Sequence, residues 1–338
     1  MRSFFVEPRS VAEPNIYMDT QKDKKIKNRT IILFLISAVT ICLLVFYVFK
    51  NKEAFQRIHQ ISYVDIAVFA FLQLVLLAVN ALVQMVYMQH FNVKVGFLNS
   101  FGLNTLHTFF NNIMVKGGIL ARGYFLKKVH QFNYTHFALM LTSFVIIDLM
   151  VGGFLGMLIL VWLAMIRGSF SVSLFGVFLL LFLGSLAITC FPISVLPTKK
   201  HLWIVRKLNE VIVSWQKIAQ DRRALGSLFL LALASFIIYA LRLQYGFAIL
   251  FKPVSFLESL LMSIVGMVAN LIGLTPGGLG IREFFVGSAY GLIQGSSVEA
   301  VVVIVLDRIV SSVLVFFVGG FFIFYFLKKS SKTHLHES

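Results

Sequence analysis

The chain has 338 residues, of which 59% are hydrophobic and 13% charged, and its mean hydropathy is +0.88. So large an apolar fraction excludes a soluble globular protein and predicts an all-α polytopic membrane protein. The formal net charge of +16 would suggest a nucleic-acid partner in a soluble chain, but Lys and Arg here flank apolar runs. That placement indicates orientation in the membrane and contact with anionic lipid, so we expect no nucleic-acid partner.

The first part of the chain predicts a cytoplasmic tail followed by two membrane spans. Residues 1–29 are polar and end in a cluster of Lys and Arg, which predicts a disordered tail. The spans and the short polar loop between them are expected over 30–49, 64–89 and 50–63. Asn80 and Gln84 lie four residues apart in the second span, so they share one helical face that we expect to point into the bundle.

Residues 98–130 predict a re-entrant helical hairpin and not a span. Two apolar legs flank a glycine-rich break, and each leg is too short to cross about 30 Å of hydrocarbon at about 1.5 Å per residue. Non-helical backbone at membrane depth is tolerated only where it is buried in protein or lines a cavity. One face of the first leg is a polar stripe, made of Ser100, Asn104, His107 and Asn111.

The rest of the chain predicts four more spans, an amphipathic helix, a second hairpin and a basic cytoplasmic tail. The spans are expected over 136–166, 171–197, 225–250 and 296–327, which makes six in all. The helix over 199–223 places apolar residues at helical spacing among Lys and Arg, which is typical of a helix on an anionic membrane surface. The hairpin over 254–294 breaks at 275–280, where Pro276 removes a backbone donor, and the tail covers 328–338.

The two hairpins share a sequence pattern, Gly-Gly-x-x-x-Arg, that indicates an internal duplication. Gly117-Gly118 precede Arg122 in the first hairpin, and Gly277-Gly278 precede Arg282 in the second, so the arginines differ by 282 − 122 = 160. Polar residues on both sides of the two motifs also match each other, at positions that differ by 159. These positions are Ser100, Asn104, His107, Asn111 and Asp148, which match Ser259, Ser263, Gly266, Asn270 and Asp307.

The expected repeats cover residues 30–166 and 167–327, and the second includes the amphipathic helix. Three spans separate the two hairpins, so the second hairpin must enter the membrane from the opposite face, and the repeat is inverted. The positive-inside rule places both termini in the cytoplasm, because the loops on their side hold most of the Lys and Arg. Inverted repeats with broken helices are the architecture of secondary transporters, in which half-helix N-termini face anionic groups.

Each arginine of the shared pattern follows a glycine-rich break, so we expect it at the start of a short helix. The free N–H groups of a helix start and a guanidinium together suit a phosphate group. The residues that we assign to substrate binding are Arg122, Arg282, Glu283, Gly117, Gly118, Gly277, Gly278 and Lys116. Glu283 either orients Arg282 or binds a cationic headgroup. The alternative is that each arginine pairs with an intramembrane carboxylate and stabilises the fold.

Two carboxylates, Asp148 and Asp307, lie within expected spans. A charged carboxylate near the bilayer centre costs about 3 kcal/mol, so each should be paired or protonated. We expect Arg122 to pair with Asp148, and Arg282 or the adjacent Arg308 to pair with Asp307. These residues are therefore structural ion pairs or, as the alternative, a proton-coupling site.

The remaining polar residues predict neither a metal nor a cofactor. The polar hairpin stripe comprises Asn104, His107, Asn111 and the second-half match Asn270. We expect His107 to be a satisfied buried group, because the histidines lack the spacing of metal ligands. Cys42 and Cys190 lie inside apolar runs, which predicts neither a disulfide nor a metal pair.

The two motifs resemble those of a known membrane-protein family. Its first motif is similar to Gly117-Gly118 with Arg122 and Tyr124, followed by Lys127-Lys128 and the span that contains Asp148. Its second, more specific motif is similar to the eight residues from Pro276 to Glu283. The family is the lysylphosphatidylglycerol synthase membrane-domain, or flippase-like, family, and the resemblance covers residues 30–327.

The resemblance implies a multi-span inner-membrane protein that moves lipids or lipid-linked precursors between leaflets. Family members include the flippase half of bacterial lysylphosphatidylglycerol synthases and stand-alone relatives linked to hopanoid or polyprenyl-phosphate-sugar pathways. The resemblance assigns the family's site positions to Arg122, Arg282 and Glu283. The 338 residues contain no aminoacyl-transferase domain, so we expect no lipid aminoacylation.

Together, these predictions favour a flippase or scramblase of the bacterial cytoplasmic membrane, and not an enzyme. Its cargo would be an anionic phospholipid or a polyprenyl-phosphate-linked lipid, and its partners membrane lipids, with a homo-oligomer or a lipid-biosynthesis partner left open. One alternative is a membrane-embedded enzyme that acts on a lipid phosphate with Asp148 or Asp307 as acid or base. Another is an accessory subunit of an envelope-lipid synthesis complex.

Overall fold

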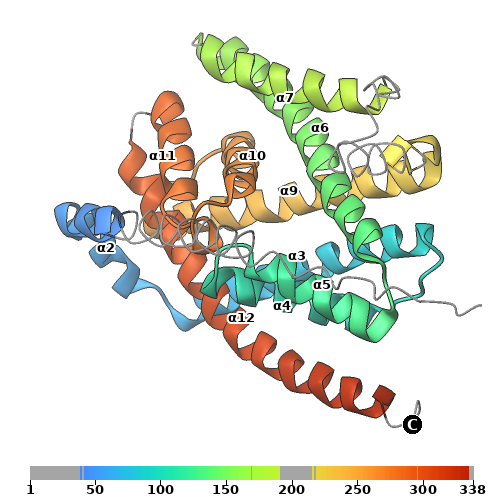
Figure 1. Cartoon of the computed structure of the whole chain (residues 1–338). Coiled ribbons are helices and arrows are strands. Elements are labelled where there is room, and N and C mark those ends of the chain that lie inside the picture. The colour runs from blue at the N-terminus through green and yellow to red at the C-terminus, as the bar shows by residue number, and fades with distance from the viewer. Residues whose placement is uncertain are drawn as a thin grey trace, which may run out of the picture.

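The computed structural model describes residues 39, 42–168, 170–190, 215, 216, 218–294 and 296–334, and every regular element in these ranges is helical. Five of the helices are long and apolar enough to cross a membrane (Figure 1). They are α3 (Tyr63–His90), α6 (Tyr134–Arg167), α7 (Val172–Cys190), α9 (Arg222–Leu250) and α12 (Ser297–His334). The prediction of an all-helical, multi-pass membrane protein is therefore confirmed.

The structure differs from the sequence-based boundaries in two places. The expected loop over 50–63 contains a short α-helix, α2 (Lys52–Gln56), and a 3₁₀ turn, η1 (Arg57–Gln60). The expected tail over 328–338 is helical as far as His334, because lysines in a last helical turn complement the helix dipole and need not end a helix.

Three predicted elements lie wholly or largely outside the described residues, and the expected tail over 1–29 is wholly outside them. Of the expected first span over 30–49, only residue 39 and residues 42–49 are described, and these are helical. Most of the expected amphipathic helix over 199–223 is not described. Its residues Trp215 and Ile218 are buried in the core of the bundle.

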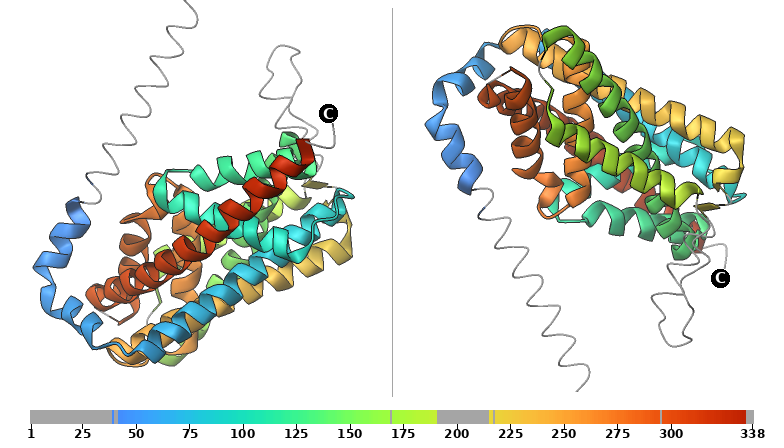
Figure 2. Two further views of the ribbon diagram at one scale, coloured as in Figure 1. Left: turned by 90° about the horizontal axis from the view of Figure 1, so that it is seen from below. Right: turned by 90° about the horizontal axis from the view of Figure 1, so that it is seen from above.

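Helices α3 and α9 lie side by side and run in opposite directions (Figure 2). The end of α3 meets the start of α9 where His90 Nδ1 lies 3.8 Å from Asp221 Oδ2. At the other end of the pair, the Tyr245 hydroxyl donates to Asp65 Oδ1 at 2.5 Å. Arg57 also donates there, to the carbonyl of Leu250 at 3.0 Å. These contacts fix the two ends of the bundle.

Two helical hairpins enter the bundle between the long helices, one from each of these ends. The first consists of α4 (Phe97–Ile113) and α5 (Gly117–His130), and the second of α10 (Phe256–Ile272), η2 (Pro276–Gly278) and α11 (Ile281–Gln294). The base of the first lies beside the C-terminal part of α12, where Tyr325 Oη donates to Asn99 Oδ1 at 3.1 Å. The base of the second lies beside the end of α9, where the rings of Phe247 and Tyr290 are 4.9 Å apart.

The tips of the two hairpins meet in the interior of the bundle, where α4 contacts η2. Asn112 at the end of α4 donates to the hydroxyl of Ser312, near the middle of α12, at 3.3 Å. A Cβ atom at Gly277 of η2 would lie 2.9 Å from Asn112 Oδ1. The arrangement therefore brings both glycine-rich breaks to one region.

The helix boundaries of the two halves follow one offset. Helices α4 and α10 begin at 97 and 256 and end at 113 and 272, so both boundaries differ by 256 − 97 = 272 − 113 = 159. Helices α3 and α9 also begin 222 − 63 = 159 residues apart. The matched polar residues of the two hairpins differ by the same 159 positions in the sequence.

Candidate functional site

The tip of the first hairpin is closed by contacts between α4 and the first turn of α5. Lys116 adopts the left-handed conformation at φ 58°, and α5 begins at the next residue. The backbone N–H of Gly118 donates to Asn111 Oδ1 at 2.9 Å, and Asn111 Nδ2 lies 3.1 Å from His107 Nε2. A Cβ atom at Gly118 would lie 2.0 Å from the carbonyl oxygen of His107, so only glycine allows this approach. The polar stripe of α4 therefore caps α5.

Arg122 does not lie at a helix start, which corrects the sequence-based expectation. Gly117-Gly118 form the first turn of α5, because the Asn111 side chain supplies the acceptor that a helix start needs. Arg122 follows five residues after Gly117, about 7 Å along the axis at 1.5 Å per residue. Its guanidinium and the N–H groups of the helix start are therefore separate features.

The side chain of Arg122 is buried, with 4% of its surface exposed, and it contacts α6 and no carboxylate of the described residues. The guanidinium carbon lies 5.5 Å from the centre of the Phe144 ring, and Nη2 lies 4.0 Å from the sulfur of Met140. The Nε atom has no hydrogen-bond partner. The expected ion pair with Asp148 is not formed, since the Phe144 ring and the Met140 thioether occupy the face of the guanidinium.

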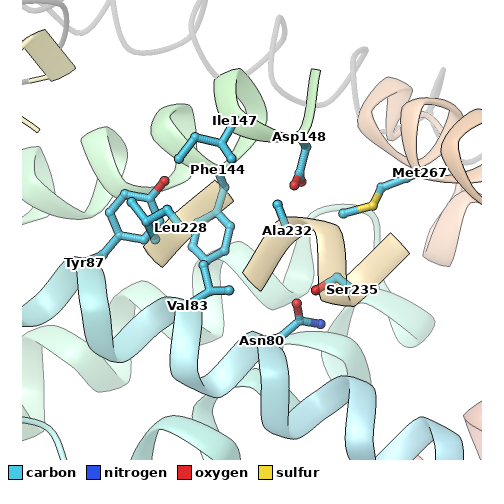
Figure 3. Close-up of a pocket in the computed structure, with 10 residues that line it drawn as sticks. All are labelled: Asn80, Val83, Tyr87, Phe144, Ile147, Asp148, Leu228, Ala232, Ser235 and Met267. Carbon is cyan, nitrogen blue, oxygen red and sulfur yellow. The ribbon is translucent and has the colours of Figure 1, made fainter. Parts of the chain in front are cut away.

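Asp148 of α6 instead points into a small cavity between four helices (Figure 3). The cavity is lined by Asn80, Val83, Tyr87, Phe144, Ile147, Asp148, Leu228, Ala232, Ser235 and Met267. No described residue forms an ion pair with Asp148. Neither arginine of the repeated motif lines the cavity, although Phe144 lies against both the cavity and Arg122.

The tip of the second hairpin is an extended glycine loop. Gly273, Gly277, Gly278 and Gly280 all have positive φ, and Pro276 starts the η2 turn. Unlike their first-half matches, Gly277-Gly278 lie outside the following helix. A Cβ atom at Gly278 would lie 2.9 Å from Asn270 Oδ1, and one at Gly273 would lie 3.7 Å from Cε of Lys116 in the other hairpin. Lys116 and Asn270 therefore flank the same loop from the two hairpins.

Asp307 is the centre of an ion-pair network in the second half. Its two oxygen atoms lie 2.5 Å from Arg242 Nη2 and 2.9 Å from Arg282 Nη2. The Arg242 side chain also donates to Gln73 of α3 and to the hydroxyl of Ser311. Both Asp307 and Arg242 are almost fully buried, so each charge depends on the other for compensation. Of the two arginines expected to pair with Asp307, Arg282 makes the contact.

Arg308 pairs with Glu283 and not with Asp307. Its Nε atom lies 2.9 Å from Glu283 Oε1, and the other carboxylate oxygen accepts from the backbone N–H of Gly280 at 2.7 Å. Glu283 thus occupies the start of α11, the position that the sequence assigned to a substrate anion. Arg282 is stacked on the Tyr239 ring, with its guanidinium carbon 4.5 Å from the ring centre.

The polar stripe of the first hairpin is also satisfied by neighbouring helices. Asn104 Nδ2 donates to Gln84 Oε1 at 2.9 Å, to the carbonyl of Ser100 at 2.9 Å and to the carbonyl of Asn80 at 3.2 Å. Gln84 is fully buried and Asn80 lines the cavity, so the prediction that both face the bundle is confirmed. The second-half match of Asn104, Ser263, donates to the carbonyls of Phe236 and Leu260.

Sequence reasoning left Arg242, Tyr239 and Ser235 out of the site. Arg242 carried a usable signal, because an arginine inside an apolar span needs a carboxylate partner. Tyr239 and Ser235 carried none, since residues of both types are common in spans. Among the described residues, no group of three or more His, Cys, Asp and Glu could hold a metal ion.

The five long apolar helices and the two hairpins between them define a multi-pass helical membrane protein. The sequence model of the lysylphosphatidylglycerol synthase TM region matches residues 31–319. The chain belongs to this family, as its two motifs indicated, and membership supports a function related to membrane lipids. No curated protein and no solved structure gives a significant match.

Proposed function

We propose that this protein moves an anionic phospholipid or a polyprenyl-phosphate-linked lipid between the leaflets of the bacterial cytoplasmic membrane. The observation that carries the proposal is the meeting of two broken-helix hairpins at a cationic centre. Three arginines there face two carboxylates: Arg242, Arg282 and Arg308 against Asp307 and Glu283, a net charge of 3 − 2 = +1. Lys116 approaches the same loop from the other hairpin. An excess of positive charge inside a bundle favours an anionic group in transit.

Arg122 is the leading candidate for the phosphate contact. Among the described residues, no carboxylate lies within ion-pair distance of this buried cation, so its guanidinium is available to an anion. Arg282 would act second, because a phosphate must compete there with Asp307. Gly117-Gly118 and Gly277-Gly278 contribute by keeping the two tips close to each other. The family membership links this site to membrane lipids.

We also propose that the two halves, 30–166 and 167–327, form an inverted repeat in the membrane. The common offset of 159 in the helix boundaries and the opposite entry of the hairpins support it. Single cysteines at residues 130 and 255, in a variant without Cys42 and Cys190, should react with impermeant reagents from opposite faces, and residue 130 from the cytoplasm. Labelling of both from one face would contradict the inverted repeat.

The transport proposal is tested with the full chain in lipid vesicles that contain a fluorescent anionic phospholipid. Dithionite quenching of the outer leaflet measures the rate of leaflet exchange. We expect Arg122→Ala to slow the exchange about tenfold or more, and Arg122→Lys to slow it less, because a charged hydrogen bond contributes about 1.5–3 kcal/mol. Lys94→Ala, which removes an exposed lysine, is the control and should exchange lipid at the original rate.

Two outcomes would contradict the transport proposal. Exchange unaffected by both Arg122→Ala and Arg282→Ala would remove these arginines from the site. Release of phosphate, or a change in the mass of the lipid, would instead favour an enzyme that acts on a lipid phosphate. The same vesicles, analysed by mass spectrometry, give this second readout.

A further inference from the structure

The cavity around Asp148 joins the two halves of the chain. Its walls come from α3 and α6 of the first half and from α9 and α10 of the second. The cavity volume that the centre of a water molecule can occupy is about 20 Å³. This is enough for one water molecule or one monatomic ion. A lipid headgroup is too large for this space, so the cavity cannot hold the transported lipid.

The polar groups of this cavity are mainly acceptors. The Asp148 carboxylate points into it and has no hydrogen-bond partner among the described residues. The Ser235 hydroxyl donates its proton to the carbonyl of Leu231 at 3.0 Å, so it offers only lone pairs to a ligand. The Asn80 side chain of α3 lies next to Ser235 in Figure 3, and Tyr87, also of α3, lines the cavity with its hydroxyl beside Ser143. Such a set of oxygen atoms suits a cation.

Among the described residues, no Lys or Arg of the surrounding helices forms an ion pair with Asp148. On α3 the titratable group nearest the cavity is Tyr87, and on α5 Arg122 is separated from the cavity by the Phe144 ring, with His107 of α4 behind it. On α9, Arg242 is seven residues beyond Ser235 and is already paired with Asp307. On α10, Glu258 is nine residues before Met267, about 13 Å along the axis. Helix α7, packed on the other side of α6, has no ionisable residue except Cys190.

We propose that Asp148, Ser235, Asn80 and Tyr87 form a binding site for one small monovalent cation, either a proton or Na⁺. A carboxylate in the interior of a membrane protein requires a counter-charge, and this site holds the oxygen atoms that would share one. Because the walls belong to both halves, a bound cation stabilises the arrangement in which the halves enclose it. Cation binding therefore shifts the equilibrium between arrangements of the two halves. The proposal does not depend on the nature of the transported molecule.

The test measures cation binding through the thermal stability of the full chain in detergent, without any transport. One arm varies pH at constant salt, and the other replaces choline chloride by NaCl at constant pH. We expect the unfolding temperature to rise with one of the two cations, and this rise to be lost in Asp148→Asn, which removes the charge at nearly constant shape. Glu53→Gln removes an exposed carboxylate far from the cavity and should keep the full rise.

The two arms distinguish the cations. A proton site gives a rise on acidification together with a deuterium-sensitive infrared band of a protonated carboxyl that Asp148→Asn abolishes. A sodium site gives a rise with NaCl, and Ser235→Ala should then weaken the apparent affinity about tenfold by removing one oxygen ligand. If Asp148→Asn does not fold, Ser235→Ala and Tyr87→Phe give the same test of the site.

The proposal is overturned if neither cation stabilises the protein. It is also overturned if Asp148→Asn keeps the response of the original chain, or if, where that variant does not fold, Ser235→Ala and Tyr87→Phe both keep it. Loss of lipid exchange with an intact cation response would refute the transport function alone, and the converse result would refute the cation site alone.

Discussion

The two halves place matched charges in opposite situations. In the second half, Asp307 is held by Arg242 and Arg282, and Arg308 is held by Glu283. In the first half, Asp148 and Arg122 sit at the matched positions, yet neither has an ion-pair partner among the described residues. The two halves therefore share a scaffold and differ in whether its charges are neutralised.

The second half holds three charged residues that the first half lacks, and the position that matches Arg308 is Leu149 (308 − 159 = 149). The position that matches Arg242 is Val83 (242 − 159 = 83), and the position that matches Glu283 is Gly123 (283 − 160 = 123). Without the two extra arginines and the extra glutamate, the first half has no such ion-pair network around Arg122 and Asp148 among the described residues. We therefore expect the second half to lose more stability than the first when a matched charged group is removed.

The largest difference is expected between Asp307 and Asp148. Replacement of Asp307 by Asn leaves two buried arginines without a carboxylate, so we expect a loss of about 3–5 kcal/mol in the free energy of unfolding. Asp148→Asn breaks no ion pair and should keep or raise the stability at neutral pH. Unfolding in mixed micelles with increasing SDS measures both. Equal losses for the two variants would contradict the difference between the halves.

Replacement of a glycine by alanine should destabilise the tip of the first hairpin more than the tip of the second. In Gly118→Ala the Cβ atom would lie 2.0 Å from the backbone oxygen of His107, which cannot rotate away, so we expect a loss of about 3 kcal/mol. Gly278→Ala meets the movable amide of Asn270 at φ 70°, and should cost about 1–2 kcal/mol. Thermal unfolding in detergent measures both, with Gly320→Ala, which meets nothing within 4 Å, as the control.

The matched pair Asn104 and Ser263 tests the polar packing of α4 against that of α10. Asn104→Ala leaves Gln84 Oε1 buried without its donor, for which we expect a loss of about 1–2 kcal/mol. Ser263→Ala leaves only backbone carbonyls, both of which belong to helices, and should cost about 0.5 kcal/mol. Equilibrium unfolding should rank the two variants in this order, and the reverse order would be inconsistent with the contacts.

The smallest effect concerns two matched helix caps, Ser62 of α3 and Asp221 of α9 (221 − 62 = 159). The backbone N–H of Ala224 is the main cause that lowers the pKa of Asp221, followed by the N–H of Arg223 and the neighbouring His90 and Arg223 charges. A lowered folded-state pKa adds stability above the unfolded pKa of about 4, which is lost as pH falls through the folded value.

We therefore expect Asp221→Ser, which copies the cap of α3, to be slightly less stable than the original chain at pH 7. The difference should shrink as the pH falls below about 4 toward the lowered folded-state pKa, because the carboxylate then becomes protonated in the folded state as well. Unfolding temperatures across this range give the measurement. A difference that stays constant with pH would show that the charge of Asp221 is not the stabilising feature.

The spans and the common offset of 159 residues could be predicted from the sequence because both depend on local patterns. An apolar run of sufficient length defines a span, and the motif Gly-Gly-x-x-x-Arg with its flanking polar positions defines the register. Arg282 was correctly expected near Asp307 for the same reason, since buried charges need partners. The partner of Glu283 was not predicted, because Arg308 reaches it from another helix.

The sequence by itself determined that the chain is a helical membrane protein with two broken hairpins, since hydropathy and glycine placement act within single segments. Only the tertiary structure decided how the charges pair, because pairing depends on which helices become neighbours. In the folded chain the start of α5 donates to the Asn111 amide, and Asp307 pairs with the distant Arg242. Asp148 instead faces a cavity. The physical reason is that a guanidinium and a carboxylate interact only at contact distance, which two segments far apart in sequence acquire on folding.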